Sequence, residues 1–233
     1  GSLVAFVVVE DAGDALWIAP AAGGEPRGLV PPPASSPRFA PSGTAFVFST
    51  GDAREPESTR AATTTIGVVD VVTGAVHALV EGQAALQPAL SSRGLIAFFA
   101  VGADGRRDIV VAHAGTSRPI IHAITADAAL DFAPQFVDGA RGDDLLFVSD
   151  RDGVAALYRV PLDDDGAARA PPTRVLQTPS PLRQFAVVDA GTRIAYVTRP
   201  AASEIVQRAL DVDAARASAS TKLLERATDL RAL

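Results

Sequence analysis

The sequence has 233 residues, of which 48% are hydrophobic and 21% are charged. Its net charge of −6 argues against a nucleic-acid-binding protein, because such a protein gathers positive charge against the phosphate backbone. The absence of cysteine excludes disulfides and thiolate metal sites, and it fits both the cytoplasm and the periplasm. The longest apolar runs are far too short to cross a bilayer, so no membrane insertion is expected within this segment.

A repeated unit dominates the chain: a turn glycine is followed five positions later by an aromatic residue. Successive aromatics are about 42 to 51 residues apart, which is the length of a four-stranded propeller blade. Short apolar stretches separated by Gly, Pro and Asp turns are typical of an all-β protein. The pairs are Gly43 with Phe48, Gly94 with Phe99, Gly142 with Phe147 and Gly191 with Tyr196, and Phe6 holds the same place in a fifth copy.

Each unit divides into four strands, here called A to D from the inside of the blade outward. The first unit lacks strand A, and the second, third and fourth units are complete. The predicted strands are 3–9, 15–19 and 25–30; 37–40, 44–49, 65–71 and 76–80; 87–90, 95–101, 108–112 and 118–124; 133–137, 144–149, 156–160 and 173–176; and 183–188, 193–198 and 205–209.

The two chain ends complement one another. The segment 229–233 resembles the start of a strand A, so we expect it to enter the first blade and close a five-bladed propeller. A truncated propeller of six or more blades is the alternative. Residues 1–233 then form a single domain, in which Gly1 and Ser2 are a cloning scar and the native start has been removed. The Ala-rich segment 213–224 fits a helix by composition, but the repeat requires a strand at 221–226, which we favour.

The repeat resembles that of TolB-type (WD40-like) β-propellers. The resemblance rests on Pro-Arg-Phe-Ala-Pro-Ser-Gly at 37–43, on Ser-Asp-Arg-Asp-Gly at 149–153 and on Ala-Pro-Gln-Phe at 133–136. The unit at 87–94 departs from the pattern with Leu-Ser-Ser-Arg-Gly, and the last unit lacks both its Pro and its Ser. The resemblance implies a propeller fold, and it implies relatives among periplasmic scaffold proteins, lipoprotein domains and gating domains of prolyl-type peptidases. The fold alone does not choose among these functions.

The motif residues have a structural interpretation. Asp and Ser in the 149–153 turn accept backbone N–H groups, and the aromatic that recurs in each unit fills the space between blades. No Gly-x-Ser-x-Gly elbow is present, and His77, His113 and His122 do not make up the three or four converging ligands of a metal site. The acidic run that starts at Asp163 lacks the Glu of an EF-hand at its twelfth position, although calcium in looser loops stays open. No metal or cofactor is therefore predicted.

Propeller glycosidases need carboxylates that project into the central channel. The predicted inner strands contain no Asp or Glu, which argues against a glycosidase. A carboxylate from a loop, such as that of Asp131, could still reach the channel, so this exclusion is not complete. A channel lined by Arg, Gln and apolar groups would favour binding over catalysis.

The sequence therefore predicts a non-enzymatic scaffold that binds a protein or peptide partner, as a module of a larger bacterial envelope protein in the periplasm. The alternative is an enzyme or the gating domain of a hydrolase. The working face is expected to carry the B–C and D–A loops, because the longest loop, 51–64, is a B–C loop. The predicted partner contacts on that loop are Asp52, Arg54, Glu55, Glu57 and Arg60.

Overall fold

The described part of the chain is all-β. The computed structural model describes residues 2–50, 64–83, 85–102, 105–113, 120–139, 142–188, 191–198, 203–211 and 216–226. Within them, antiparallel pairing produces one three-stranded sheet and four four-stranded sheets. The described residues contain no helix long and apolar enough to cross a membrane.

The strands follow the repeat. Within the described residues, the first sheet has no strand A, and every later sheet is an A–B–C–D meander, as predicted. The strands are β1 (Leu3–Glu10), β2 (Gly13–Pro20) and β3 (Arg27–Val30); β4 (Ser35–Phe39), β5 (Ala45–Ser49), β6 (Thr64–Asp70) and β7 (Val76–Gln83); β8 (Ala85–Leu90), β9 (Leu95–Val101), β10 (Arg107–His113) and β11 (Ile121–Ala123); β12 (Asp131–Gly139), β13 (Gly142–Ser149), β14 (Ala156–Pro161) and β15 (Thr173–Leu176); and β16 (Leu182–Val188), β17 (Arg193–Thr198), β18 (Ser203–Asp211) and β19 (Arg216–Arg226).

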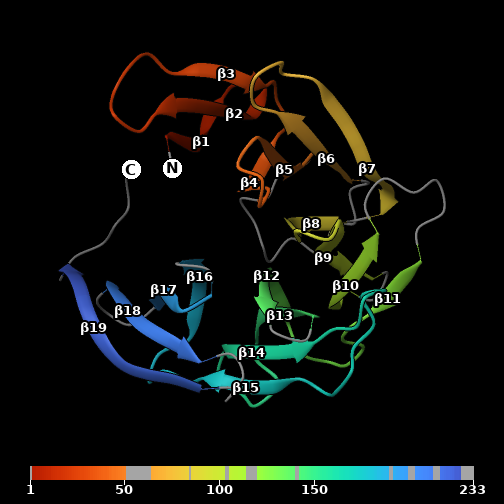
Figure 1. Ribbon diagram of the computed structural model, residues 1–233, viewed down its shortest axis with the longest axis vertical. Coiled ribbons are helices and arrows are strands. Elements are labelled where there is room, and N and C mark those ends of the chain that lie inside the picture. The colour runs from red at the N-terminus through yellow and green to blue at the C-terminus, as the bar shows by residue number, and fades with distance from the viewer. Residues whose placement is uncertain are drawn as a thin grey trace.

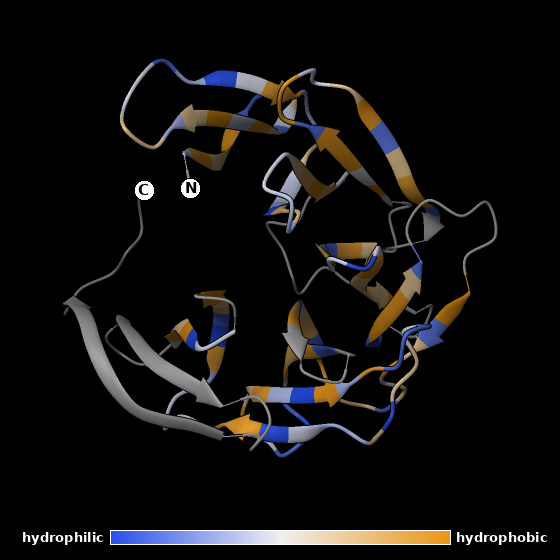
Figure 2. Ribbon diagram, in the orientation of Figure 1, coloured by the Kyte–Doolittle hydropathy of each residue, from blue (hydrophilic) through white to orange (hydrophobic). Residues whose placement is uncertain are grey.

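The sheets are arranged as blades around a common centre (Figure 1). Strands β4, β8, β12 and β16 lie nearest the centre, and β7, β11, β15 and β19 lie at the periphery. Figure 2 shows hydrophobic residues alternating with hydrophilic ones along many of the strands. The composition of 213–224 had left a helix open, but β19 pairs with β18 along this segment, so the strand interpretation is confirmed and the helix is wrong. Tertiary pairing outweighs the helix propensity of alanine here.

The hydrophobic core is divided into four clusters, each between two neighbouring sheets. Phe48 packs in the cluster between the first and second sheets, and Phe98 in the cluster between the second and third. Phe147 belongs to the cluster between the third and fourth sheets, and Tyr196 to the one between the fourth and fifth. The inter-blade role predicted for the recurring aromatics therefore holds for Phe48, Phe147 and Tyr196, and Phe99 shares the cluster of Phe147.

Phe6 differs from the other repeat aromatics. It is only partly buried and belongs to none of the four clusters formed by the described residues. On the same strand, Leu3 and Ala5 pack toward the second sheet. Alternation along a strand therefore turns Phe6 to the opposite face of the first sheet. The segment 229–233, predicted to complete this sheet, lies outside the described residues.

Gly67 provides a test of the packing between the first two sheets. A Cβ added at this position on β6 would lie 2.7 Å from Cζ of Phe48, which is buried in that interface. We expect Gly67→Ala to lower the free energy of unfolding by about 1–3 kcal/mol, because overpacking a close-packed core forces strain on its neighbours. Urea denaturation measures the change.

Gly28→Ala is the matched control, because a Cβ there would meet Trp17 at an ordinary 3.7 Å. The urea midpoint of this variant should stay close to that of the wild type. Equal losses in the two variants would contradict the proposed contact with Phe48.

Candidate functional site at the centre of the propeller

A cavity of about 620 Å³ lies where the inner strands converge, and it is lined by residues from all five sheets. Volumes of this size are typical of ligand sites. Among the described residues, its lining contains no aspartate, glutamate or histidine. The lining residues are Val7, Ser36, Pro37, Arg38, Gln87, Arg107, Leu130, Phe132, Ala133, Arg183, Gln184 and Val197.

Three arginines from three blades give the cavity its charge. Arg38 comes from β4, Arg107 from the start of β10 and Arg183 from β16. Arg107 is buried, and its guanidinium carbon lies 5.6 Å from the centre of the Phe99 ring. Arg183 is exposed. Burial lowers the pKa of Arg38, since desolvation disfavours its charged form, yet an arginine keeps its charge under all ordinary conditions.

β-Bulges on the inner strands shape this lining. Each of β4, β8, β12 and β16 has an extra residue relative to its partner strand, near its start. The three described non-glycine residues with left-handed φ lie at these bulges: Ser36 (53°), Gln87 (53°) and Ala133 (54°). All three line the cavity. Bulges redirect side chains, and strained backbone persists only where its surroundings hold it, so the lining is built on a fixed frame.

Two glutamines connect neighbouring inner strands. Gln87 on β8 accepts the backbone N–H of Ala133 on β12 through Oε1 at 2.8 Å. Gln135 on β12 accepts the N–H of Val187 on β16 at 2.9 Å. Each bond satisfies a backbone donor from the next blade. Gln87 also lines the cavity, and its amide NH₂ group is a donor that this bond does not use.

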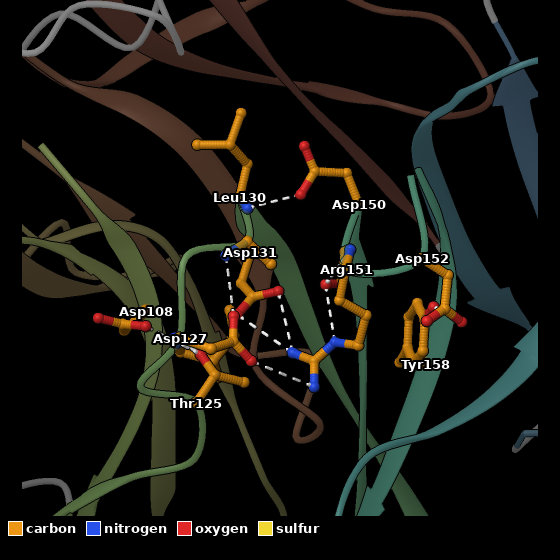
Figure 3. Close-up of polar contacts among 12 residues, drawn as sticks. Asp108, Thr125, Asp127, Leu130, Asp131, Asp150, Arg151, Asp152 and Tyr158 are labelled. Carbon is orange, nitrogen blue, oxygen red and sulfur yellow. Dashed lines mark hydrogen bonds and ion pairs between the residues drawn. The ribbon is translucent and has the colours of Figure 1, made fainter. Parts of the chain in front are cut away.

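The Ser-Asp-Arg-Asp-Gly turn forms a polar network beside the cavity, between the third and fourth blades (Figure 3). Arg151 donates to Oδ1 of Asp131 at 3.2 Å and pairs with Asp127 at 3.6 Å. Its Nε donates to Ser149 Oγ at 2.9 Å. The guanidinium carbon lies 5.0 Å from the centre of the Tyr158 ring. These contacts support the structural interpretation of the turn, because the side chains of Ser149, Arg151 and Asp152 bond to other groups of the protein.

Asp131 is the buried centre of that network. Its side chain has no exposure to solvent, and burial raises its pKa above the ordinary value of an aspartate. The same burial effect, together with the nearby charge of Asp131, raises the pKa of Asp108. The Tyr158 hydroxyl donates to Asp152 at 2.7 Å, and burial followed by this hydrogen bond raises the pKa of Tyr158 to about 12.

Asp131 corrects one expectation from the sequence. The inner strand β12 begins at Asp131, so the prediction that the inner strands contain no acidic residue is wrong, as is the placement of Asp131 in a loop. The strand starts two residues before the predicted 133 because Asp131 pairs with Ser149 in the ladder. The carboxylate nevertheless does not line the cavity, because Arg151 holds it within the protein.

The predicted partner-binding residues Asp52, Arg54, Glu55, Glu57 and Arg60 lie outside the described residues. The strand ends that flank their loop are described. Ser49, the last residue of β5, pairs with Ser35, the first residue of β4, so β5 ends at the end of the blade where β4 begins.

The acidic run at Asp163 caps a turn. Its Oδ1 accepts the N–H groups of Asp165 at 3.1 Å and Ala167 at 2.8 Å. Within the described ranges, no group of three histidines or carboxylates is placed to hold a metal ion. None of these arginines was predicted from the sequence to be a site residue, and Arg107 lay just outside its predicted strand. Arg38 and Arg183 lie on strands that were predicted to be inner strands, and this position could have identified them as residues that face the centre.

Five antiparallel sheets around a polar centre define a β-propeller-like fold, and solved structures confirm the resemblance to TolB-type propellers. The structure of "putative TolB" from Agrobacterium tumefaciens matches with a TM-score of 0.70 and 13% identity, over 95% of this chain and 76% of that one. Identity at this level establishes the fold alone.

Two enzymes share the fold as well. An oligogalacturonate lyase from Vibrio parahaemolyticus matches with a TM-score of 0.59 and 13% identity, over 98% of this chain and 65% of the lyase. A puromycin-hydrolyzing peptidase from Mycobacterium tuberculosis matches with a TM-score of 0.58 and 17% identity, over 93% of this chain and 38% of the peptidase. The sequence matches no protein-family model, and its comparison with curated proteins also gives no match.

Arg151→Met tests the buried network. Removing the guanidinium leaves the Asp131 carboxylate buried without its counter-charge, so we expect a loss of about 3 kcal/mol in unfolding free energy near pH 7. Because the folded pKa of Asp131 is already raised, its contribution to stability is fully present below the unfolded pKa and declines as pH rises through the folded pKa. Without Arg151 the folded pKa rises further, so the loss should shrink toward about pH 4. Urea midpoints across this pH range measure it.

Arg174→Met is the control, because Arg174 pairs with Asp152 at 3.0 Å on the exposed surface. This variant should lose less than about 1 kcal/mol. A loss in Arg151→Met that does not change with pH would contradict the role assigned to Asp131.

Proposed function

We propose that this chain is a non-catalytic binding module that holds a protein or peptide partner at the central cavity and on the loops around its entrance. The observation that carries the proposal is the composition of the lining. General acid–base catalysis needs a titratable group positioned at the reacting atom, and the described lining offers Arg, Gln and Ser beside apolar side chains, without a carboxylate or imidazole. Such a lining is suited to recognition, because it donates hydrogen bonds and buries apolar surface.

The partner surface is proposed to extend onto the long loop of the second blade. Its charged residues Asp52, Arg54, Glu55, Glu57 and Arg60 are the proposed contacts. In support, the described residues that flank this loop contact two inner strands that line the cavity: Ser49 pairs with Ser35 on β4, and the Thr64 hydroxyl donates to the carbonyl of Ala85 at the start of β8 at 2.7 Å. Loops carried on a rigid frame are the usual place for binding residues.

We further propose that the chain is a single five-bladed propeller domain in which 229–233 adds the missing inner strand beside β1, with six or more blades as the alternative. The three-stranded first sheet supports this, because its inner edge is unpaired within the described residues. The module is proposed to belong to a larger protein of the bacterial envelope, consistent with the fold that it shares with a TolB.

The alternative function is a domain of a hydrolase. It is favoured by the match to a peptidase of which this chain spans only 38%. A propeller in that position would regulate access to a separate catalytic domain. It would have no activity of its own, and it would not retain a partner at its centre.

Neutralising the loop tests the binding surface. A variant with Asp52→Asn, Arg54→Gln, Glu55→Gln, Glu57→Gln and Arg60→Gln should keep its thermal midpoint and recover several-fold less partner from the source cells, as measured by quantitative mass spectrometry. Charged groups at an interface rim contribute to partner selection and association rate.

Asp164→Asn is the control for that experiment. Asp164 is exposed and pairs with Arg93 at the opposite end of the blades, so partner recovery should be unchanged. Equal recovery by the loop variant and the wild type would contradict the loop as a binding surface. A partner set composed of cytoplasmic proteins would contradict the envelope assignment.

Deleting 229–233 tests the closure. Loss of an inner strand would expose the edge of β1 that faces away from β2, so we expect a lower thermal midpoint and faster exchange of the β1 amides on that edge, whereas the β1 amides bonded to β2 stay protected. Hydrogen exchange followed by mass spectrometry compares the exchange rates of the β1 amides in the truncated and the full-length chain. If the β1 amides are equally unprotected in both, the tail does not pair there.

A further inference from the structure

Arg38 occupies an unusual position for an arginine. It is partly buried at the centre of the propeller, and the described residues provide it with neither an ion pair nor a hydrogen bond. Its side chain also lines a second, smaller cavity of about 160 Å³, together with Gln184 and Val197 of the fifth blade. A desolvated guanidinium without a counter-charge is costly unless an anion approaches it.

Arg183 also lines the central cavity. It comes from β16 of the fifth blade, whereas Arg38 comes from β4 of the second, and neither has a carboxylate partner within the described residues. Arg107 of β10 also lines the cavity, although it already has partners within the protein. The two guanidinium groups of Arg38 and Arg183, which come from separate blades, suit a ligand that carries several separated negative charges better than one with a single charge. The guanidinium fork binds carboxylates through two parallel hydrogen bonds.

The remainder of the lining is apolar or donates hydrogen bonds. Leu130 and Val197 are large hydrophobic residues that remain exposed at the cavity, with 44% and 36% of their surface accessible. Phe132 adds an aromatic surface, and Gln87 offers its amide NH₂. A small inorganic anion would leave these apolar groups uncovered. A peptide that alternates acidic and apolar side chains would contact both kinds of surface.

We propose that the central cavity is an anion site that binds a ligand bearing several carboxylates, and that its source is an acidic, partly apolar segment of a partner protein. This inference rests on the proposed function and names the chemistry of the partner. The net charge of −6 on the chain as a whole confines the attraction to the cavity, because the remaining surface repels an acidic partner.

The test measures binding of a labelled peptide of alternating glutamate and leucine by fluorescence anisotropy. The glutamate peptide should bind, and its affinity should fall as NaCl rises from about 50 to about 300 mM, because salt screens a partly exposed charge site. A peptide with glutamine in place of glutamate should bind at least about tenfold more weakly, since charge-assisted hydrogen bonds are lost. Equal binding of the two peptides overturns the proposal.

Two cavity variants and one surface variant locate the site. Arg38→Gln and Arg183→Gln should each lower the affinity for the glutamate peptide by about tenfold or more. Arg174→Gln removes an arginine from the exposed outer strand β15 and should change affinity by less than about twofold. Because Arg183 is exposed, its variant should fold normally even if Arg38→Gln does not. Unchanged affinity in Arg183→Gln overturns the assignment to this cavity.

Tricarballylate distinguishes a free small polycarboxylate from a peptide. If it competes only at concentrations far above those of the peptide, a protein segment is the source of the carboxylates. If it binds as tightly as the peptide, the anion site stands and the peptide source is overturned. If neither ligand binds, the anion site is overturned. The partner recovery described above is measured separately, so the proposed function can survive that result.

Discussion

Apolar packing between the faces of neighbouring sheets is the interaction on which the rest of this structure depends. Each sheet is apolar on the faces it turns to its neighbours, so no blade could bury its residues alone. The four clusters divide the core accordingly, one for each contact between consecutive sheets. Phe48, Phe147 and Tyr196 anchor three of them, and burial of an aromatic removes a large apolar area from water. The position of every inner strand, and hence of the cavity, follows from this packing.

Polar contacts then fix the blades relative to one another. The amides of Gln87 and Gln135 each accept a backbone N–H from the next inner strand. The guanidinium of Arg151 joins the buried Asp131 to the turn that follows β13. Apolar packing is weakly directional, whereas a buried polar group that loses its partner carries a large penalty. These contacts therefore specify how the blades dock, and the pairing of Asp131 with Arg151 keeps that carboxylate out of the central cavity.

The functional site is a consequence of this arrangement. Bulges at the starts of the inner strands turn selected side chains toward the centre, and the prolines that follow Ser36, Gln87 and Ala133 restrict the backbone there. A rigid frame of this kind reduces the entropy lost when a ligand binds. The same fold occurs in a protein described as a putative TolB, in a lyase and in a peptidase, so the fold itself does not determine function; the side chains at its centre do.

The sequence by itself determined the strands and their order within each sheet, because alternation and turn residues are local signals. It also determined that β19 is a strand, since the repeat outweighed the composition of its segment. Only the tertiary structure decided that Arg38, Arg107 and Arg183 share one cavity. Arg38 and Arg183 lie on the inner strands β4 and β16, whereas Arg107 begins β10, the third strand of its sheet, so no single position of the repeat relates all three. Their convergence arises from the placement of whole sheets around a centre, which is set by contacts between residues far apart in sequence.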